Sequence, residues 1–163
     1  MDKEIDSLKT GRGLVRSLDP EIEKPHYRMA ISANGGQVPS MGEMERKLSA
    51  FLRKMREQAG LTRAEFAPLL GLSVPVYSRY ERAFSKIHVT RLLHVCELLG
   101  LSPVEMLYEA APHLWGSTDE EAEDRFRLVA LVLKLPHRTT RDLMRMVEHL
   151  GQMENGRVAT KPY

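Results

Sequence analysis

The segment from Leu61 to Arg82 constrains the fold most, because its pattern predicts two short helices joined by a tight turn. Thr62 and Glu65 have the spacing of a capping box, in which each side chain satisfies a free N–H at a helix start. Gly71 is the residue expected in the turn, since glycine adopts a left-handed conformation at no steric cost. Ser73 follows at an N-cap position, so we expect it to start the second helix.

Two prolines limit the lengths of these helices. Pro68 lies inside the first helix and is expected to bend or shorten it, because an internal proline costs about 3 kcal/mol. Pro75 falls in the first turn of the second helix, where a missing N–H costs little. Tyr77 and Tyr80 are three residues apart and are expected to anchor this helix, about 74–82, to the core. The residues left for its outer face are Val74, Pro75, Val76, Ser78 and Arg79.

Further helices are predicted on both sides of this segment. The range 43–59 has apolar residues at helical spacing and ends at Gly60, a common stop residue. Its expected buried face consists of Leu48, Phe51, Leu52 and Met55. Three basic residues fall outside that face: Arg53, Lys54 and Arg56. The range 90–99 predicts another helix, whose inner face consists of Leu92, Val95, Cys96 and Leu99. A short helix of about 103–110 follows it.

The C-terminal third predicts two more helices. The first starts at Ser117, with Glu120 at capping spacing, and is apolar on nearly every side from Phe126 to Leu135. A helix that is apolar all round must be covered on more than one face. Pro136 ends this helix, and the range 139–150 then carries a single apolar stripe.

The N-terminal part gives the weakest pattern. Its prolines and the Asn34-Gly35 turn signal interrupt any long helix, and the alternation around Tyr27 allows one short strand. We therefore expect residues 1–42 to form a largely irregular, flexible arm. The range 43–112 is expected to be the central domain, and 113–163 a C-terminal helical hairpin.

Composition excludes several classes of protein. The net charge is +2, but basic residues dominate from Met44 to Arg91 and acidic residues from Glu97 to Arg125, which favours a polyanionic partner. With Cys96 alone, no internal disulfide can form, which suits the cytoplasm. The histidines lack zinc-site spacing, and no catalytic or phosphate-binding motif occurs. We expect no metal, no cofactor, no membrane span and no enzymatic activity.

Four motifs in register carry a family resemblance. They read LRKMREQAGLT, EFAPLLGLS, YSRYER and LLHVCELLGLSPVEML, and together they cover about Leu48 to Tyr108. This arrangement resembles the Cro/cI-like (XRE) helix-turn-helix regulators. The resemblance implies an all-α, five-helix, phage-repressor-like DNA-binding domain whose third helix enters the DNA major groove.

The resemblance also implies which residues contact double-stranded DNA. The implied base-reading residues are Ser73, Val74, Pro75, Val76, Ser78 and Arg79. The implied phosphate contacts are Arg63, Arg82, Lys86, Thr90 and Arg91. Val74 and Pro75 stand where family members often carry polar residues, so they are expected to contact thymine methyl groups. Arg79 is expected to make a bidentate contact with guanine O6 and N7.

The expected function is sequence-specific transcriptional regulation by a homodimer, because one such domain reads only a few base pairs. The C-terminal helices supply the expected pairing surface, which consists of Phe126, Val129, Leu133, Leu143, Met146, Val147 and Leu150. The alternative is an antitoxin-like interaction protein whose C-terminal helices bind another protein.

Overall fold

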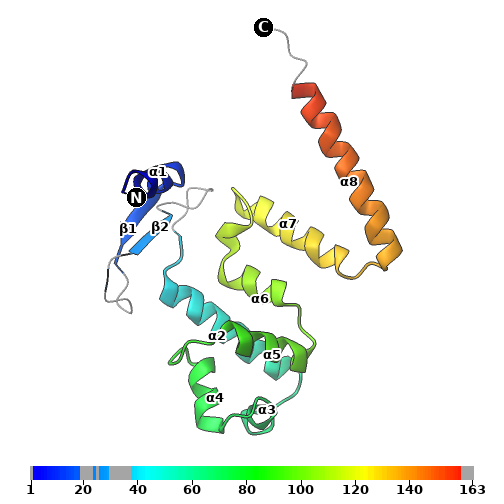
Figure 1. Cartoon of the computed structure of the whole chain (residues 1–163). Helices are drawn as coiled ribbons and strands as arrows, with labels where there is room; N and C mark the ends of the chain where they lie inside the picture. The colour runs from blue at the N-terminus through cyan, green and yellow to red at the C-terminus, as the bar shows by residue number, and fades with distance from the viewer. Residues whose placement is uncertain (1, 19–23, 25, 30–37, 159–163) are drawn as a thin grey trace. The chain divides into compact units, whose positions relative to one another are not determined.

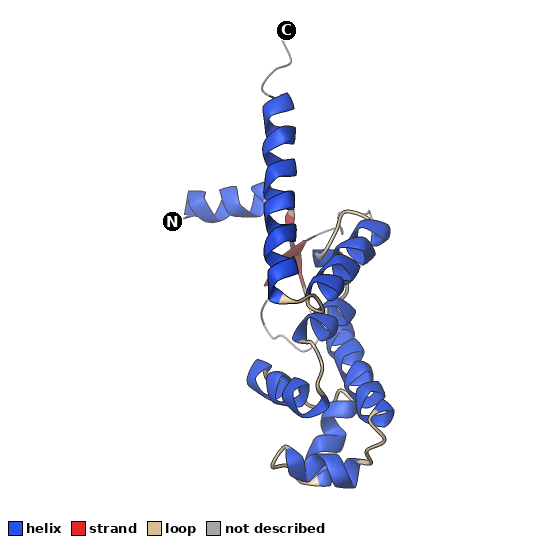
Figure 2. Cartoon of the chain, turned by 90° about the vertical axis from the view of Figure 1, so that its right-hand side faces the viewer, coloured by secondary structure: helices blue, strands red, loops and turns tan. Residues whose placement is uncertain are grey.

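The computed structural model describes residues 2–18, 24, 26–29 and 38–158 (Figure 1). The chain divides into two compact units, Met1–Phe126 and Arg127–Tyr163. The described residues are mostly helical, as Figure 2 shows, so the all-α class expected from the sequence is confirmed.

The N-terminal residues form more regular structure than their sequence suggests. Helix α1 (Asp2–Gly11) leads into strand β1 (Leu14–Ser17), which pairs antiparallel with β2 (His26–Met29). The Lys9 ammonium lies 4.6 Å from the centre of the Tyr27 ring, which ties α1 to β2. The expectation of a largely irregular arm is therefore wrong for these elements. The Asn34-Gly35 turn signal lies outside the described residues.

Five helices follow in the order that the motifs predict: α2 (Met41–Gln58), α3 (Arg63–Leu69), α4 (Val74–Glu81), α5 (Val89–Leu99) and α6 (Pro103–Ala110). The capping box at the start of α3 is confirmed, since Glu65 N donates to Thr62 Oγ1 and Thr62 N donates to Glu65 Oε2. Helix α3 ends one residue after Pro68, as a shortened helix should. In the turn that follows, Gly71 has a φ of +68°, a conformation that residues with a side chain rarely adopt.

The start of α2 and the capping of α4 differ from the sequence interpretation. Helix α2 begins two residues early, because Ser40 and Glu43 form a capping box of their own. Ser73 occupies the N-cap position of α4, but its side chain makes no capping hydrogen bond.

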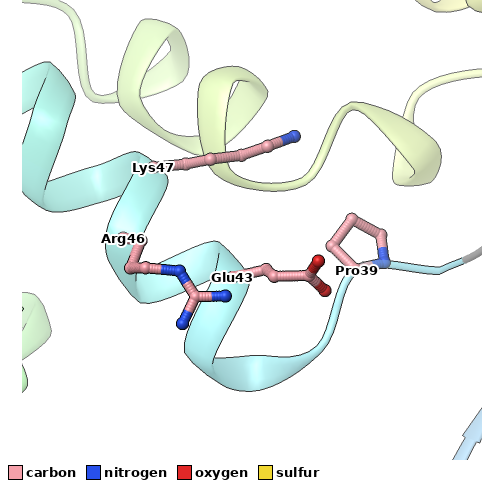
Figure 3. A pocket seen from close by; sticks show the side chains of 4 residues that line it. All are labelled: Pro39, Glu43, Arg46 and Lys47. Atoms are coloured by element: carbon pink, nitrogen blue, oxygen red, sulfur yellow. The ribbon is translucent and has the colours of Figure 1, made fainter.

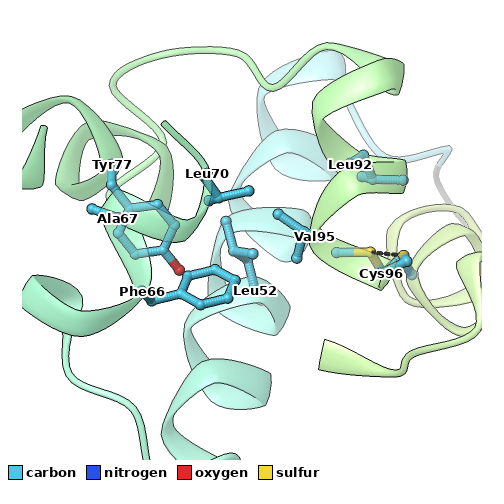
Figure 4. Close-up of a cluster of buried hydrophobic side chains, with 9 residues drawn as sticks. Leu52, Phe66, Ala67, Leu70, Tyr77, Leu92, Val95 and Cys96 are labelled. Atoms are coloured by element: carbon cyan, nitrogen blue, oxygen red, sulfur yellow. Dashed lines mark hydrogen bonds between the residues drawn. The ribbon is translucent and has the colours of Figure 1, made fainter. Parts of the chain in front are cut away.

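The core lies between α2, α3, α4, α5 and α6 (Figure 4). Phe66 and Tyr77 meet edge to face, with ring centres 5.3 Å apart, and both are fully buried. The thiol of Cys96 lies 3.3 Å from the Met106 sulfur inside this core. Burial raises the pKa of Cys96, so this residue packs as a small apolar side chain.

The buried stripe of α2 is rotated relative to the expected one. Its fully buried members are Ser49, Leu52 and Arg56, whereas Leu48 and Phe51 are only partly buried. The placement of Arg56 outside the buried face is therefore wrong, because this guanidinium finds an acidic partner in the interior.

The first unit ends in an aromatic cluster. After the short 3-10 helix η1 (Pro112–Leu114), helix α7 (Asp119–Val132) begins at a Thr118–Glu121 cap, two residues later than expected. Phe126 stacks on Tyr108 with ring centres 4.2 Å apart, and Trp115 packs edge-on against both rings. Phe126 thus packs inside the first unit, whereas the sequence interpretation placed it on a pairing surface.

The second unit consists of the last part of α7 and helix α8 (His137–Val158). Helix α8 starts two residues before the predicted range, directly after Pro136. Four residues expected at the pairing surface are each more than half exposed: Leu133, Met146, Val147 and Leu150. Within the described residues, no helix is long and apolar enough to cross a membrane.

Gly116 provides a test of the packing at the end of the first unit. A Cβ atom at this position would lie 2.5 Å from the Ala122 nitrogen and 2.8 Å from the Glu121 carbonyl carbon. We predict that Gly116→Ala lowers the free energy of unfolding by about 1–3 kcal/mol, because backbone must shift. Gly11→Ala is the control, since nothing lies within 4 Å of its Cβ. Denaturant unfolding checks both, and equal stabilities would contradict the close approach.

Candidate nucleic-acid interface

Helix α4 presents one face to the core and another to solvent. Tyr77 and Glu81, four residues apart, point inward and are buried. Val74, Val76 and Arg79 lie on the exposed side. Ser78 is only 8% exposed, so its expected place on the outer face is wrong. Its hydroxyl accepts a hydrogen bond from Arg82 Nη2 at 2.9 Å.

The inner face of α4 is held by a buried ion-pair network. The Glu81 side chain has no exposed area, and its Oε1 accepts from Arg56 Nε at 2.6 Å. The other oxygen, Oε2, accepts from Arg63 Nε at 2.6 Å and from Arg56 Nη2 at 3.2 Å. Arg56 comes from α2 and Arg63 from the start of α3, so one carboxylate joins three helices.

Burial alone would raise the pKa of Glu81, but the hydrogen bonds from Arg56 and Arg63 outweigh that effect and hold the pKa below its ordinary value. Burial raises the pKa of the neighbouring Tyr77 phenol, which therefore stays neutral. At neutral pH the network therefore keeps Glu81 ionised beneath α4, with two guanidinium groups bonded to it.

The sequence contains a signal for this network that the sequence interpretation missed. Glu81 is four residues after Tyr77, and Arg56 is four residues after Leu52, so each charge shares a helix face with a core residue. A charged side chain on a core face requires an opposite partner, because an unpaired buried charge is very costly. Two such charges of opposite sign, each on a core-facing side of its helix, are therefore expected to pair with each other.

The arginines expected at phosphates occupy different environments. Arg63 bonds Glu81, yet its side chain remains 37% exposed. Arg91 Nη1 donates to the Leu70 carbonyl and so braces the end of α3. Arg82 donates to Ser78, while Lys86 and Thr90 lie on the exposed surface.

Comparison with known families agrees with this geometry. Residues 47–107 match the family model described as a helix-turn-helix domain. This part of the chain belongs to the helix-turn-helix family. The match covers α2 to α6, in which α3 and α4 are the paired helices and Gly71 lies in the turn.

Two crystal structures of the clp gene regulator ClgR from Corynebacterium glutamicum are similar to the chain. One is 33% identical, with 41% of this chain and 87% of that chain covered and a TM-score of 0.39. The other is 27% identical, with 64% and 90% covered and a TM-score of 0.38. Among curated protein sequences, none matches the chain significantly.

Other surface features lie away from the exposed face of α4. A pocket near the start of α2 is lined by Pro39, Glu43, Arg46 and Lys47 (Figure 3). The Glu43 carboxylate there accepts from Ser40 N in the α2 cap, which lowers the pKa of Glu43. In the part of the chain that the structure describes, no group of three or more acidic, histidine or cysteine side chains could hold a metal ion.

The second unit contains an apolar groove between the end of α7 and α8. Leu128 and Val132 line it from α7, and Leu143, Met144 and Val147 line it from α8. Leu143 and Val147 belong to the pairing surface that the sequence predicts. All of the residues that line the groove lie outside the range 47–107, which runs from α2 to α6.

We predict that acid destabilises the helix-turn-helix domain through Glu81. The unfolded chain binds a proton at this carboxyl near pH 4.5, whereas the folded domain does so only at lower pH. The stability that Glu81 contributes is therefore present above about pH 4.5 and is lost as the pH falls through the folded pKa. Glu81→Gln should be less stable by about 3–5 kcal/mol at pH 7, because it leaves buried guanidinium charge uncompensated.

Denaturant unfolding of both proteins between about pH 7 and pH 3 measures this difference. The difference in free energy of unfolding between wild type and Glu81→Gln should become smaller as the pH falls. Glu57→Gln is the control, because its half-exposed carboxylate pairs with Arg53 and with the outer side of the same Arg56, and its loss should give a much smaller difference. A difference for Glu81→Gln that is constant with pH would be inconsistent with the lowered pKa.

Proposed function

We propose that the protein is a sequence-specific, DNA-binding transcriptional regulator of the Cro/cI-like class that binds DNA as a dimer. The observation that carries the proposal is the helix-turn-helix domain, in which α4 keeps one side in the core and presents Arg79 on the other. In this proposal α4 lies in the major groove, where a helix can reach base edges.

The exposed residues of α4 give the chemistry of base reading. Arg79 offers a planar fork of donors that fits the O6 and N7 acceptors of guanine. Val74 and Val76 are exposed and apolar, so they suit the methyl group of thymine. Ser73 and Pro75 also lie at the exposed start of α4. We omit Ser78 from this set, because it is buried and bonded to Arg82.

Phosphate contacts complete the proposed interface. Arg82, Lys86 and Thr90 lie between the end of α4 and the start of α5, where their exposed side chains can approach the DNA backbone. Arg63 and Arg91 can contribute charge there while they brace the domain through Glu81 and Leu70. Such contacts set the register of the protein on DNA without reading its sequence.

Dimerisation is proposed through the second unit. The exposed stripe of α8 follows helical spacing and joins the apolar groove beside α7. Apolar surface left in water loses about 25 cal/mol per Å² relative to burial, which favours coverage by a second copy. The proposed pairing residues are Val129, Leu133, Leu143, Met146, Val147 and Leu150. A two-fold dimer matches the symmetry of palindromic DNA sites, whose halves are about 34 Å apart.

Selection of bound duplexes from random DNA by the purified full chain tests the proposal. A sequence-specific dimer should enrich one palindrome with two half-sites about one helical turn apart. Enrichment of a single half-site would support specific binding and contradict the dimer. A pool without any consensus would overturn the proposed function.

We predict that Arg79→Ala weakens binding to the selected duplex by about 1–3 kcal/mol per half-site and relaxes preference at one base pair. The reason is the loss of a bidentate contact, whereas the buried face of α4 is unchanged. The measurement is binding to the selected duplex and to variants at each position. Lys54→Ala, on the exposed side of α2, is the control. Unchanged preference at every position would refute base reading by Arg79.

We predict that Leu150→Glu converts the dimer to a monomer. Leu150 is 55% exposed in the single chain, so the change should leave the monomer folded while placing a charge in the apolar contact between copies. Gln152→Glu is the matched control, because it adds the same charge to an exposed position on the opposite side of α8. Light scattering at micromolar concentration distinguishes the variants. A wild-type chain that is monomeric would contradict the pairing role.

A further inference from the structure

Helix α4 is followed directly by a tight turn around Ala83. Ala83 has φ of +55° and is the one non-glycine residue with positive φ that the described part of the chain contains. The N–H groups of Phe84 and Ser85 both donate to the Arg79 carbonyl, at 2.9 and 3.3 Å. This left-handed helix end brings Ser85 beside a residue six positions earlier.

The turn places the Ser85 hydroxyl against the Arg79 side chain. Arg79 Nε donates to Ser85 Oγ at 3.1 Å, although Arg79 itself is on the exposed face of α4. Neither Nη group of Arg79 has a hydrogen-bond partner among the described residues. One edge of the guanidinium is therefore attached to the protein, and the end with both Nη groups is available.

The second arginine at this end of α4 is held differently. Arg82 Nε and Nη2 both donate to Ser78, at 3.3 and 2.9 Å, and its guanidinium lies 5.5 Å from the centre of the Phe84 ring. Arg82 thus bonds back onto α4 and its cap. Of these two side chains, only Arg79 has both Nη groups available to donate to two neighbouring acceptors of a ligand.

We propose that Ser85 is a positioning residue that orients Arg79 for an end-on contact with a guanine. Bound at Nε, the guanidinium presents Nη1 and Nη2 to O6 and N7, the two acceptors of guanine in the major groove. A long side chain loses rotamer freedom when it binds, and the Ser85 bond restricts Arg79 before DNA arrives. This inference rests on the proposed function, because it requires that Arg79 read a base.

The test measures discrimination by the full chain between two duplexes. The first is the duplex selected from random DNA, and the second has adenine in place of the guanine at which Arg79→Ala loses preference. We expect Ser85→Ala to reduce the ratio of the two affinities by about 2- to 10-fold, the range for one hydrogen bond. Ser85→Thr keeps a hydroxyl and should restore the ratio. In an Arg79→Ala background, Ser85→Ala should have no further effect on it.

Four outcomes separate this inference from its alternatives. An unchanged ratio for Ser85→Ala would overturn the positioning role, and so would an equal loss in the Arg79→Ala background. Equal weakening on both duplexes would overturn it too, because that pattern indicates a contact with the DNA backbone or a general structural effect. Failure of the wild type to select any consensus would instead overturn the proposed function. Thermal unfolding of each variant verifies that the domain remains folded.

Discussion

The carboxylate of Glu81 is the group on which the arrangement of the helix-turn-helix depends. It is fully buried, and Arg56 of α2 and Arg63 of α3 donate to its two oxygens at 2.6 Å. Moving either arginine away from this carboxylate is costly, because the buried charge would then be neither hydrated nor fully paired. The three helices therefore cannot rotate about their axes independently, which fixes the side of α4 that faces solvent.

This constraint links the core to the proposed recognition of DNA. Tyr77 and Glu81 determine the inner side of α4, so Arg79 must lie on the outer side, two residues after Tyr77. The turn at Ala83 then supplies Ser85 as a partner for the Arg79 guanidinium. A rigid scaffold and a restrained side chain lower the entropy that must be lost on binding.

Local signals in the sequence predicted the helices well, because caps and glycine stops act between near neighbours. The Thr62–Glu65 box, the turn at Gly71 and the burial of Tyr77 are all confirmed. The missed features depend on contacts between distant residues: Arg56 with Glu81, and Phe126 with Tyr108. Periodicity identifies the face on which a residue lies, but it does not identify the partner that occupies the space opposite. Ser78 differs from these cases, because its bonding partner Arg82 is only one turn away, and the helical pattern alone does not show that Ser78 is 8% exposed.

The most direct test of major-groove recognition is interference by guanine methylation. Dimethyl sulfate adds a methyl group to N7, the acceptor that the proposed Arg79 contact requires in the major groove. Duplexes selected by the full chain are methylated sparsely, and the protein-bound and free fractions are then compared at every guanine. Methylation of one particular guanine in each half-site is expected to exclude the duplex from the bound fraction. Equal methylation of every guanine in the two fractions would contradict the placement of α4 in the major groove.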